Sequence, residues 1–292
     1  KQLGRCHCGM AAFGDNPHPM EKRRSAVNIQ ASQIFKDIET IRTKAPLVHN
    51  ITNFVVMNTT ANALLALGAS PVMAHGENEV SDMAKLANAL VINIGTLSDP
   101  WIQSMVKAGK TAREKNIPLI LDPVGAGATA YRTDTALTLI RETGPAVIRG
   151  NGSEIMALCA KEEATKGVDS TSSSDAAIRS ARSLSLDHGC IVCVTGEVDY
   201  IISGQDTGII KNGHAMMPRV TGLGCTATAL CGAFAAVNPD FAQAAAHAMA
   251  VMGIAGEMAA ESSRGPGSLQ LNFIDSLYSI NETDIQTRLK TK

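Results

Sequence analysis

The sequence predicts an α/β protein with a mostly parallel central sheet, helices on both faces and a helical C-terminal part. Short apolar segments of strand length recur along the chain, and segments with helical periodicity separate them. These strand segments carry no alternating polar face, which is typical of parallel strands covered by helices on both sides. The order of the segments therefore predicts a doubly wound sheet.

The expected helices and strands alternate from residue 29 onward. Ile34, Ile38 and Ile41 recur at helical spacing, and residues 54–67 predict a second helix that ends at Gly68 as a C-cap. Further strands are expected at residues 71–74, 90–94, 119–122, 146–149 and 190–195. Further helices are expected at residues 80–88, 101–115, 133–142 and 175–187.

The rest of the chain indicates one domain with a short extension before it. Residues 200–211 predict a hairpin that turns at residues 204–206, and residues 225–289 are nearly all helical. We therefore expect residues 29–292 to form a single α/β domain. Residues 1–28 lack periodicity and are expected to be a disordered extension, although their basic residues leave an organelle-targeting role as an alternative.

The composition narrows the class of protein. The formal net charge is −1 and no long basic run occurs, so we expect no nucleic-acid partner. No apolar run reaches the roughly 20 residues that span a bilayer, so we expect no membrane partner. The odd number of cysteines, 7 scattered mostly among apolar residues, indicates reduced thiols and a cytoplasmic protein.

Two cysteine patterns suggest a metal site but are incomplete. Cys190 and Cys193 form a C-x-x-C inside an expected strand, where residues three apart face opposite sides. A shared metal or a disulfide is therefore not expected there. Residues 6–8 read Cys-His-Cys, but no second pair of ligands completes a zinc site.

Residues 220–236 carry the strongest functional signal. Gly222 and Gly224 open a helix of small residues, and glycine lets the backbone approach a ligand closely. The free N–H groups of the first helical turn attract negative charge. This turn therefore predicts an anion site, with Cys225 beside the reacting phosphate.

Polar and small residues follow the expected strands, at the edge where parallel sheets bind ligands. These segments are residues 49–53, 95–96, 122–127, 149–151 and 195–197. Because the carboxyl ends of parallel strands meet at one edge, these segments could build one crevice. Asp122 and Glu154 both follow expected strands, and two such acids together favour a metal ion.

Two nucleotide-binding motifs are present only in part. Gly109-Lys110-Thr111 resembles the end of a P-loop, but Ser104 stands where that motif requires glycine, and the segment lies inside an expected helix. The pattern G-x-G-x-x-A begins at Gly125 and again at Gly222. Neither opens the first βαβ unit, and no strand-end acid follows about twenty residues later, so a nicotinamide enzyme is not favoured.

Several segments resemble the hydroxyethylthiazole kinase family, which belongs to the ribokinase-like kinases. They include Val-His-Asn-Ile-Thr-Asn at residues 48–53 and Val-Thr-Gly-Glu-Val-Asp at residues 194–199. The resemblance extends over residues 46–53, 64–73, 93–97, 121–127, 148–154, 194–200, 221–225 and 265–268. It implies ATP-dependent phosphorylation of the hydroxyl of 4-methyl-5-(2-hydroxyethyl)thiazole in thiamine salvage, by a homotrimer whose active sites lie between subunits.

The resemblance also implies a role for each matching residue. Cys225 stands where most ribokinase-like enzymes carry an aspartate base, and Asp122 and Glu154 match positions associated with Mg²⁺, in part through its waters. The positions that contact ATP correspond to Arg149, Asn151, Thr195 and Gly224. The positions that contact the substrate correspond to Met73, Gly222, Asn53, Gly95 and Thr96. Leu223 departs from the small residue that is usual between the two glycines, and it either narrows the pocket mouth or faces the core.

Plainer roles stay open for these residues. Asp122 could start a turn before proline, Glu154 could interact with a helix dipole, and Arg149 could form a surface ion pair. Met73 and Thr195 could serve packing alone. A hydroxymethylpyrimidine-type kinase of the same fold, and a non-catalytic nucleotide-binding sensor, are the alternative functions.

Overall fold

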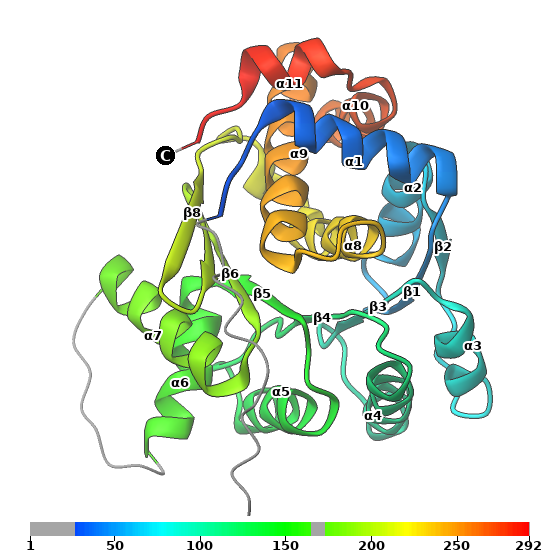
Figure 1. Cartoon of the computed structure of the whole chain (residues 1–292), viewed down its shortest axis with the longest axis vertical. Coiled ribbons are helices and arrows are strands. Elements are labelled where there is room, and N and C mark those ends of the chain that lie inside the picture. Colours follow the sequence, from blue (N-terminus) through cyan, green and yellow to red (C-terminus); the bar gives the residue numbers. More distant parts are fainter. Residues whose placement is uncertain (1–26, 165–172, 292) are drawn as a thin grey trace, which may run out of the picture.

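An eight-stranded sheet forms the centre of the computed structural model, which describes residues 27–164 and 173–291 (Figure 1). The strand order is β2-β1-β3-β4-β5-β6-β7-β8. The parallel strands are β1 (Leu47–Ile51), β2 (Ser70–Val72), β3 (Ala89–Asn93), β4 (Leu119–Asp122), β5 (Val147–Asn151) and β6 (Ile191–Thr195). An antiparallel hairpin of β7 (Asp199–Ser203) and β8 (Asp206–Ile210) extends the sheet beyond β6.

Helices cover both faces of this sheet (Figure 1). One layer contains α3 (Val80–Leu86), α4 (Asp99–Glu114), α5 (Ala130–Thr143), α6 (Gly152–Ala164) and α7 (Ser173–His188). The opposite layer contains α1 (Ala31–Lys44), α2 (Met57–Leu67), α8 (Leu223–Ala235), α9 (Phe241–Glu261), α10 (Pro266–Ser279) and α11 (Glu282–Arg288). This arrangement confirms the predicted mostly parallel, ribokinase-like sheet with a helical C-terminal part.

Two hydrophobic cores lie on the two faces of the sheet, and alternate strand residues enter each. In β3, Val91 belongs to the core on the α8 side, whereas Leu90 and Ile92 belong to the core on the α4 side. In the same way Cys190 and Cys193 enter different cores, as the sequence predicts. The double burial explains why these strands carry no polar face.

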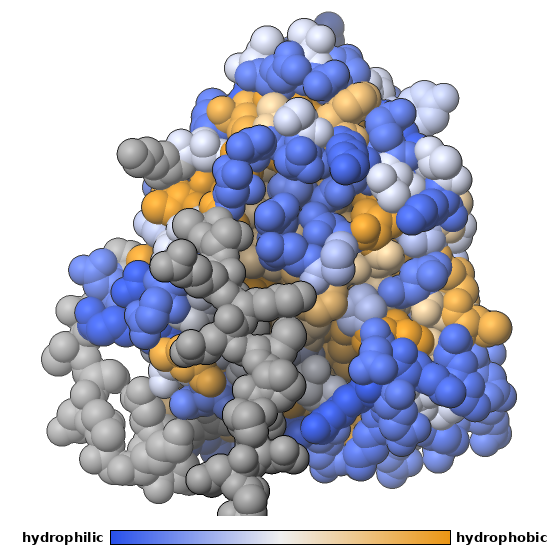
Figure 2. Space-filling model, viewed as in Figure 1, coloured by the Kyte–Doolittle hydropathy of each residue, from blue (hydrophilic) through white to orange (hydrophobic). Residues whose placement is uncertain are grey.

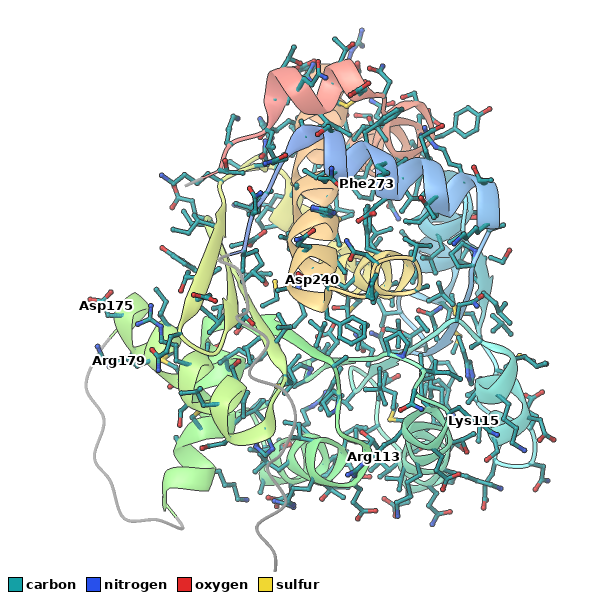
Figure 3. The ribbon with its side chains drawn as sticks, in the orientation of Figure 1. Arg113, Lys115, Asp175, Arg179, Asp240 and Phe273 are labelled. Atoms are coloured by element: carbon teal, nitrogen blue, oxygen red, sulfur yellow. The ribbon has the colours of Figure 1, made fainter. Side chains whose placement is uncertain are left out.

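The layer above the sheet packs through small residues and a few large ones. Ile34, Ile38 and Ile41 of α1 are fully buried, while hydrophilic residues are prominent on the outer surface of this layer in Figure 2. Phe273 of α10 points into the same layer and is fully buried (Figure 3).

At the start of α9, the Asp240 carboxylate accepts hydrogen bonds from the Ala242 and Gln243 N–H groups, both at 3.1 Å, and caps the helix.

Helix α8 is buried against the middle of the sheet because Gly232 allows a very close approach. A Cβ at Gly232 would lie 2.6 Å from Val91 Cγ2 and 3.1 Å from Val48 Cγ1, which is too close for any side chain. The helix therefore lies flat on β1 and β3. The first turn of α8 lies at the carboxyl edge of the sheet, where Thr228 contacts Asp122 of β4 and Gly224 lies against Arg149 of β5.

The expected element bounds need three corrections. The helix expected from residue 54 begins only at Met57, after a turn. His49, Asn50 and Ile51 do not follow the first strand but lie within it, because β1 stays paired with β3 as far as Ile51. Gly150 and Asn151 likewise belong to β5, paired with β6. Of the expected N-terminal extension, residues 1–26 lie outside the described residues.

Candidate active site

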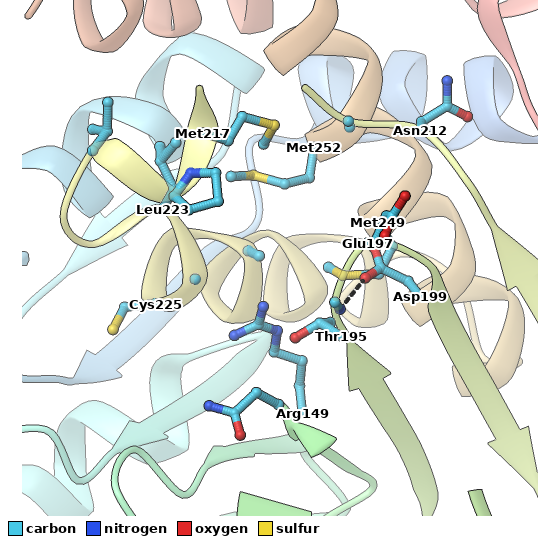
Figure 4. Close-up of a pocket in the computed structure, with 18 of the residues that line it drawn as sticks. Arg149, Thr195, Glu197, Asp199, Asn212, Met217, Leu223, Cys225, Met249 and Met252 are labelled. Carbon is cyan, nitrogen blue, oxygen red and sulfur yellow. Dashed lines mark hydrogen bonds between the residues drawn. The ribbon is translucent and has the colours of Figure 1, made fainter. Parts of the chain in front are cut away.

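A cavity of about 1180 Å³ lies at the carboxyl ends of β4, β5 and β6, beneath α9 (Figure 4). It brings together most of the residues that the sequence selects at strand ends and at the glycine turn. These are Asp122, Arg149, Asn151, Glu154, Thr195, Gly222, Gly224 and Cys225. The single crevice expected at this edge of the sheet is thus present only in part: residues of 122–127, 149–151 and 195–197 line the cavity, whereas residues 49–53 and 95–96 do not.

The glycine turn begins α8 in the manner that the sequence predicts. Gly222 is the N-cap residue and has φ of +85°, a left-handed conformation that favours glycine. Gly224 lies against Arg149, and a Cβ there would be 3.1 Å from its Nη1 atom. Leu223, which departs from the family pattern, is buried in the core on this side of the sheet and also borders the cavity.

Arg149 extends from β5 to a place beneath the first turn of α8 (Figure 4). Its Nε atom is buried and has no hydrogen-bond partner among the described residues. Arg149 also forms no ion pair within this part of the chain, so the surface ion pair considered above is not what the structure contains. A buried donor without a partner is costly, and together with the free N–H groups of the helix end it forms a site for an anion.

Asp122 ends β4 as a buried carboxylate. Its Oδ2 atom accepts hydrogen bonds from Asn93 Nδ2 at 2.8 Å and from Thr228 Oγ1 at 2.7 Å. Burial raises the pKa of Asp122 to about 7, although the Arg149 charge and these two donors lower it. Oδ1 accepts no hydrogen bond from the described residues, which leaves it available to a ligand.

Glu154 is committed to the backbone instead. Its Oε1 atom accepts from the Gly125 N–H at 2.9 Å, and its Oε2 atom accepts from the Asn151 N–H at 2.8 Å. The Asn151 side chain returns the bond by accepting from the Glu154 N–H at 2.9 Å, as in a capping box. Glu154 therefore starts α6 and ties the loop after β4 to it, so an ion here would meet this carboxylate through water.

Cys225 lies in the first turn of α8 at the boundary of the cavity. Its Sγ atom lies 3.4 Å from Asn53 Nδ2, which also donates to Asn93 Oδ1 at 2.8 Å. Burial raises the pKa of the Cys225 thiol, and the neighbouring Asp122 carboxylate raises it further. These two effects act against the helix N-terminus, which lowers the pKa of a thiol.

Sequence reasoning missed two residues of this polar network, Asn93 and Thr228. Asn93 is a buried residue at the end of β3, and it joins Asp122 to Asn53. Thr228 lies one helical turn after Gly224 and points to the same carboxylate. The only sequence signals were a polar residue ending an apolar strand and a hydroxyl three residues after Cys225, both of which are compatible with ordinary packing.

Four predicted substrate residues form a second group outside the large cavity. Asn53 contacts Cys225, and a Cβ at Gly95 would lie 2.6 Å from the Asn53 amide nitrogen. The Thr96 hydroxyl accepts from the backbone N–H of residue 54 at 3.2 Å, and Met73 follows β2. Cys225 thus stands between this second group and the cavity, so both sets of predicted residues meet at its thiol.

Aromatic side chains extend the second group towards the surface. Trp101 packs against Phe54 and His75, with ring centroids 4.7 and 4.6 Å apart. The outermost residues are Phe54 and Val55, which are 66% and 63% exposed. Two large apolar side chains in sequence are therefore open to solvent beside the predicted substrate residues.

The fold and the site together define a ribokinase-like small-molecule kinase: a parallel sheet carries a glycine turn, a buried arginine and two acids along one edge. Solved structures with this fold include the pyridoxal kinase from Staphylococcus aureus, which aligns at a TM-score of 0.56 over 73% of this chain and 88% of its own, with 15% identity.

The model of the hydroxyethylthiazole kinase family matches residues 38–283, and the chain belongs to this family. A hydroxyethylthiazole kinase from Syntrophus aciditrophicus is 60% identical over 87% of this chain and 94% of its own length. One from Leptospira biflexa is 54% identical over 88% and 96%. The solved hydroxyethylthiazole kinase of Pyrococcus horikoshii is 46% identical, with a TM-score of 0.83 over 89% of this chain and 98% of that one.

The raised pKa of Asp122 predicts how the stability of the protein depends on pH. The pKa of Asp122 is about 7 in the folded protein and has the ordinary value of 3.8 in the unfolded chain. Between these two pH values the unfolded chain releases the proton more readily, so the free energy of unfolding of the ligand-free protein falls as the pH rises from 3.8 to about 7. Asp122→Asn keeps an acceptor for Asn93 and Thr228. We expect it to stabilise the ligand-free protein by about 1–3 kcal/mol near pH 8 and by much less near pH 5.

Thermal unfolding of both proteins at the two pH values checks this expectation. Asp199→Asn serves as the comparison, because burial raises the pKa of Asp199 only to about 6. A destabilised Asp122→Asn protein near pH 8 would show that the carboxylate is a net stabilising charge, contrary to its burial.

Proposed function

We propose that this protein transfers the γ-phosphoryl group of ATP to the hydroxyl of 4-methyl-5-(2-hydroxyethyl)thiazole, a reaction of thiamine salvage. Membership of the hydroxyethylthiazole kinase family supports the substrate. One structural observation carries the chemistry: the buried, unpartnered Nε of Arg149 beneath the free N–H groups of α8. That arrangement would stabilise a phosphate, because a buried donor without a partner and the N–H groups of a helix end both favour negative charge.

The two substrates would meet at Cys225. ATP would occupy the large cavity, with its triphosphate towards α8 and in contact with Arg149, Asn151, Thr195 and Gly224. The thiazole would lie beside Asn53, Met73, Gly95, Thr96 and Gly222. This places the acceptor hydroxyl and the terminal phosphate on opposite sides of one turn, where orientation supplies much of the rate.

The residues present fit a Mg²⁺ ion bound with the triphosphate. Mg²⁺ prefers oxygen ligands and keeps several waters, and Asp122 offers a carboxylate oxygen without a hydrogen bond, while Glu154 faces the same cavity with both oxygens already used. When bound, the ion would neutralise charge on the phosphate oxygens. Asn93 and Thr228 would hold Asp122 in place for it.

Cys225 would orient the acceptor hydroxyl and take its proton late in the reaction. The transition state of phosphoryl transfer is loose, so the hydroxyl needs little activation before the phosphoryl group has nearly left. The proton would go to the thiolate form of Cys225, which the hydrogen bond from Asn53 Nδ2 favours. The N–H groups of the turn and Arg149 would stabilise the charge on the transferred group.

We also propose a homotrimer in which a second subunit covers Phe54 and Val55 and completes the thiazole site. The support is the exposure of these two apolar side chains next to Asn53. No helix among the described residues has the length and apolar character to cross a membrane. A cytoplasmic location is proposed because Cys190, Cys193, Cys225 and Cys231 carry thiols, as a reducing compartment keeps them.

The test of the activity offers one acceptor at a time. The purified protein is incubated with Mg-ATP and either hydroxyethylthiazole, hydroxymethylpyrimidine or no acceptor, and ADP and phosphorylated product are measured, the latter by mass. We expect product from the thiazole alone. Product only from the pyrimidine would keep the ATP site but refute the substrate, and no turnover at all would favour the nucleotide-binding sensor.

Replacing the thiol tests the role of Cys225. Because proton transfer is late, we expect Cys225→Ala to reduce kcat only about tenfold to a hundredfold, which is at or below the lower end of the usual contribution of a general base. The matched control is Cys231→Ala, a buried cysteine of the same helix that does not border the cavity. Unchanged kcat in a folded Cys225→Ala protein would show that the thiol takes no part.

A charge on the exposed apolar pair tests the trimer. Sedimentation of the unaltered protein should give about three times the chain mass of 30.6 kDa. Val55→Asp should dissociate it, since an unpaired carboxylate in an apolar interface is costly. The control is Leu186→Asp, at an exposed leucine on α7, which should leave the trimer intact. A trimer that survives Val55→Asp would place the interface elsewhere.

A further inference from the structure

One wall of the large cavity consists of a segment with little core of its own. Residues 211–218, between β8 and the glycine turn, contribute several lining positions, among them Asn212, His214 and Met217. Most of these residues are exposed, and of the segment only Asn212 is buried. Something outside the segment must therefore hold it in place.

The support comes from one face of α9. Five residues lie along one side of this helix because they are spaced three or four residues apart in successive turns. They are Met249, Met252, Gly253, Gly256 and Glu257. Met249 and Met252 border the cavity itself (Figure 4). The last three of the five meet the segment.

The two glycines let the segment lie directly on the helix. A Cβ at Gly253 would be 2.6 Å from the Asn212 backbone carbonyl, so any side chain there would push the segment away. At Gly256 a Cβ would collide with the sulfur atom of Met217. The segment therefore occupies space that only glycine leaves free.

Glu257 makes the polar connection at the end of this face. Its Oε1 atom accepts from Asn212 Nδ2 at 3.0 Å, from the Gly213 N–H at 2.9 Å and from Lys290 Nζ at 2.9 Å. The carboxylate is only 12% exposed. Charged acceptors make stronger hydrogen bonds than neutral ones, so a single oxygen fixes both a side chain and the backbone of the segment.

The C-terminal residues complete this connection. Asn212 Nδ2 also donates to the Arg288 carbonyl at 2.7 Å, and its Oδ1 atom accepts from the Lys290 N–H at 2.8 Å. The Lys211 N–H donates to the Lys290 carbonyl at 2.9 Å. The side chain of Asn212 is thereby held from two directions, by α9 and by the end of the chain.

We propose that Glu257 is a positioning residue for the nucleotide: it holds residues 211–217 against α9, and so shapes the cavity wall that ATP binds. Glu257 itself does not line the large cavity, so it acts through Asn212 and Gly213. This role rests on the proposed binding of ATP in that cavity. The role concerns the nucleotide more than the thiazole, because only Gly222 of the predicted thiazole residues borders the large cavity.

The test uses the full-length enzyme with Glu257→Ala and Glu257→Gln. The alanine variant loses three hydrogen bonds, and we expect the KM for ATP to rise about tenfold, with kcat and the KM for the thiazole within about twofold of the unaltered enzyme. Glutamine keeps an oxygen acceptor for Asn212 and Gly213, so it should restore most of the affinity. Calorimetry with Mg-AMP-PCP measures the same change without turnover.

Glu261→Ala is the matched control. Glu261 lies one turn further along α9 and pairs with Arg288, with Nη1 to Oε1 at 2.6 Å, but has no bond to residues 211–217. Equal effects of the two alanine variants, a parallel rise in both KM values, or a lowered melting temperature with unchanged KM for ATP would each overturn the positioning role. An unaltered enzyme that does not bind Mg-AMP-PCP would refute the proposed function itself, and this role with it.

Discussion

The separation of two buried charges, the Arg149 guanidinium and the Asp122 carboxylate, is the constraint around which the site is built. They influence each other's ionisation, yet no direct ion pair joins them. Asp122 is held by Asn93 and Thr228, and the Arg149 Nε atom has no hydrogen-bond partner in the described part of the chain. A direct pair would be more stable but would present little charge to a ligand. The ligand-free protein is therefore less stable than it would be with a direct ion pair, as is usual for a site whose charges are preorganised for a ligand.

That separation depends on the close packing of α8. Gly232 brings the middle of the helix onto β1 and β3, and this fixes the position of its first turn above Arg149. Alanine and glycine dominate α8 and α9 for the same reason, and aromatic residues are scarce in the whole chain at 3%. The many small residues and the few aromatic ones therefore reflect the short distance between these helices and the sheet.

The sequence predicts those parts of the molecule that depend on local pattern. Doubly buried strands and helical periodicity predict the sheet, and the strand-end rule finds Asp122, Arg149 and Glu154. Tertiary pairing decides the rest: β3 keeps His49 inside β1, although the polar residues there suggest a loop. The Asn93–Asp122–Thr228 network and the packing of Trp101 between Phe54 and His75 join distant segments, so no local pattern reveals them.

The two sides of Cys225 are enclosed to different degrees, and this difference bears on the reaction we propose. The nucleotide side is a cavity walled by α9 and residues 211–218, whereas the thiazole side ends at the exposed Phe54 and Val55. A kinase that leaves its acceptor side open admits water, which competes with the acceptor hydroxyl for the phosphoryl group. A second subunit over Phe54 and Val55 would exclude that water. Assembly would then be part of the proposed chemistry, because the acceptor side of a single chain ends at exposed side chains.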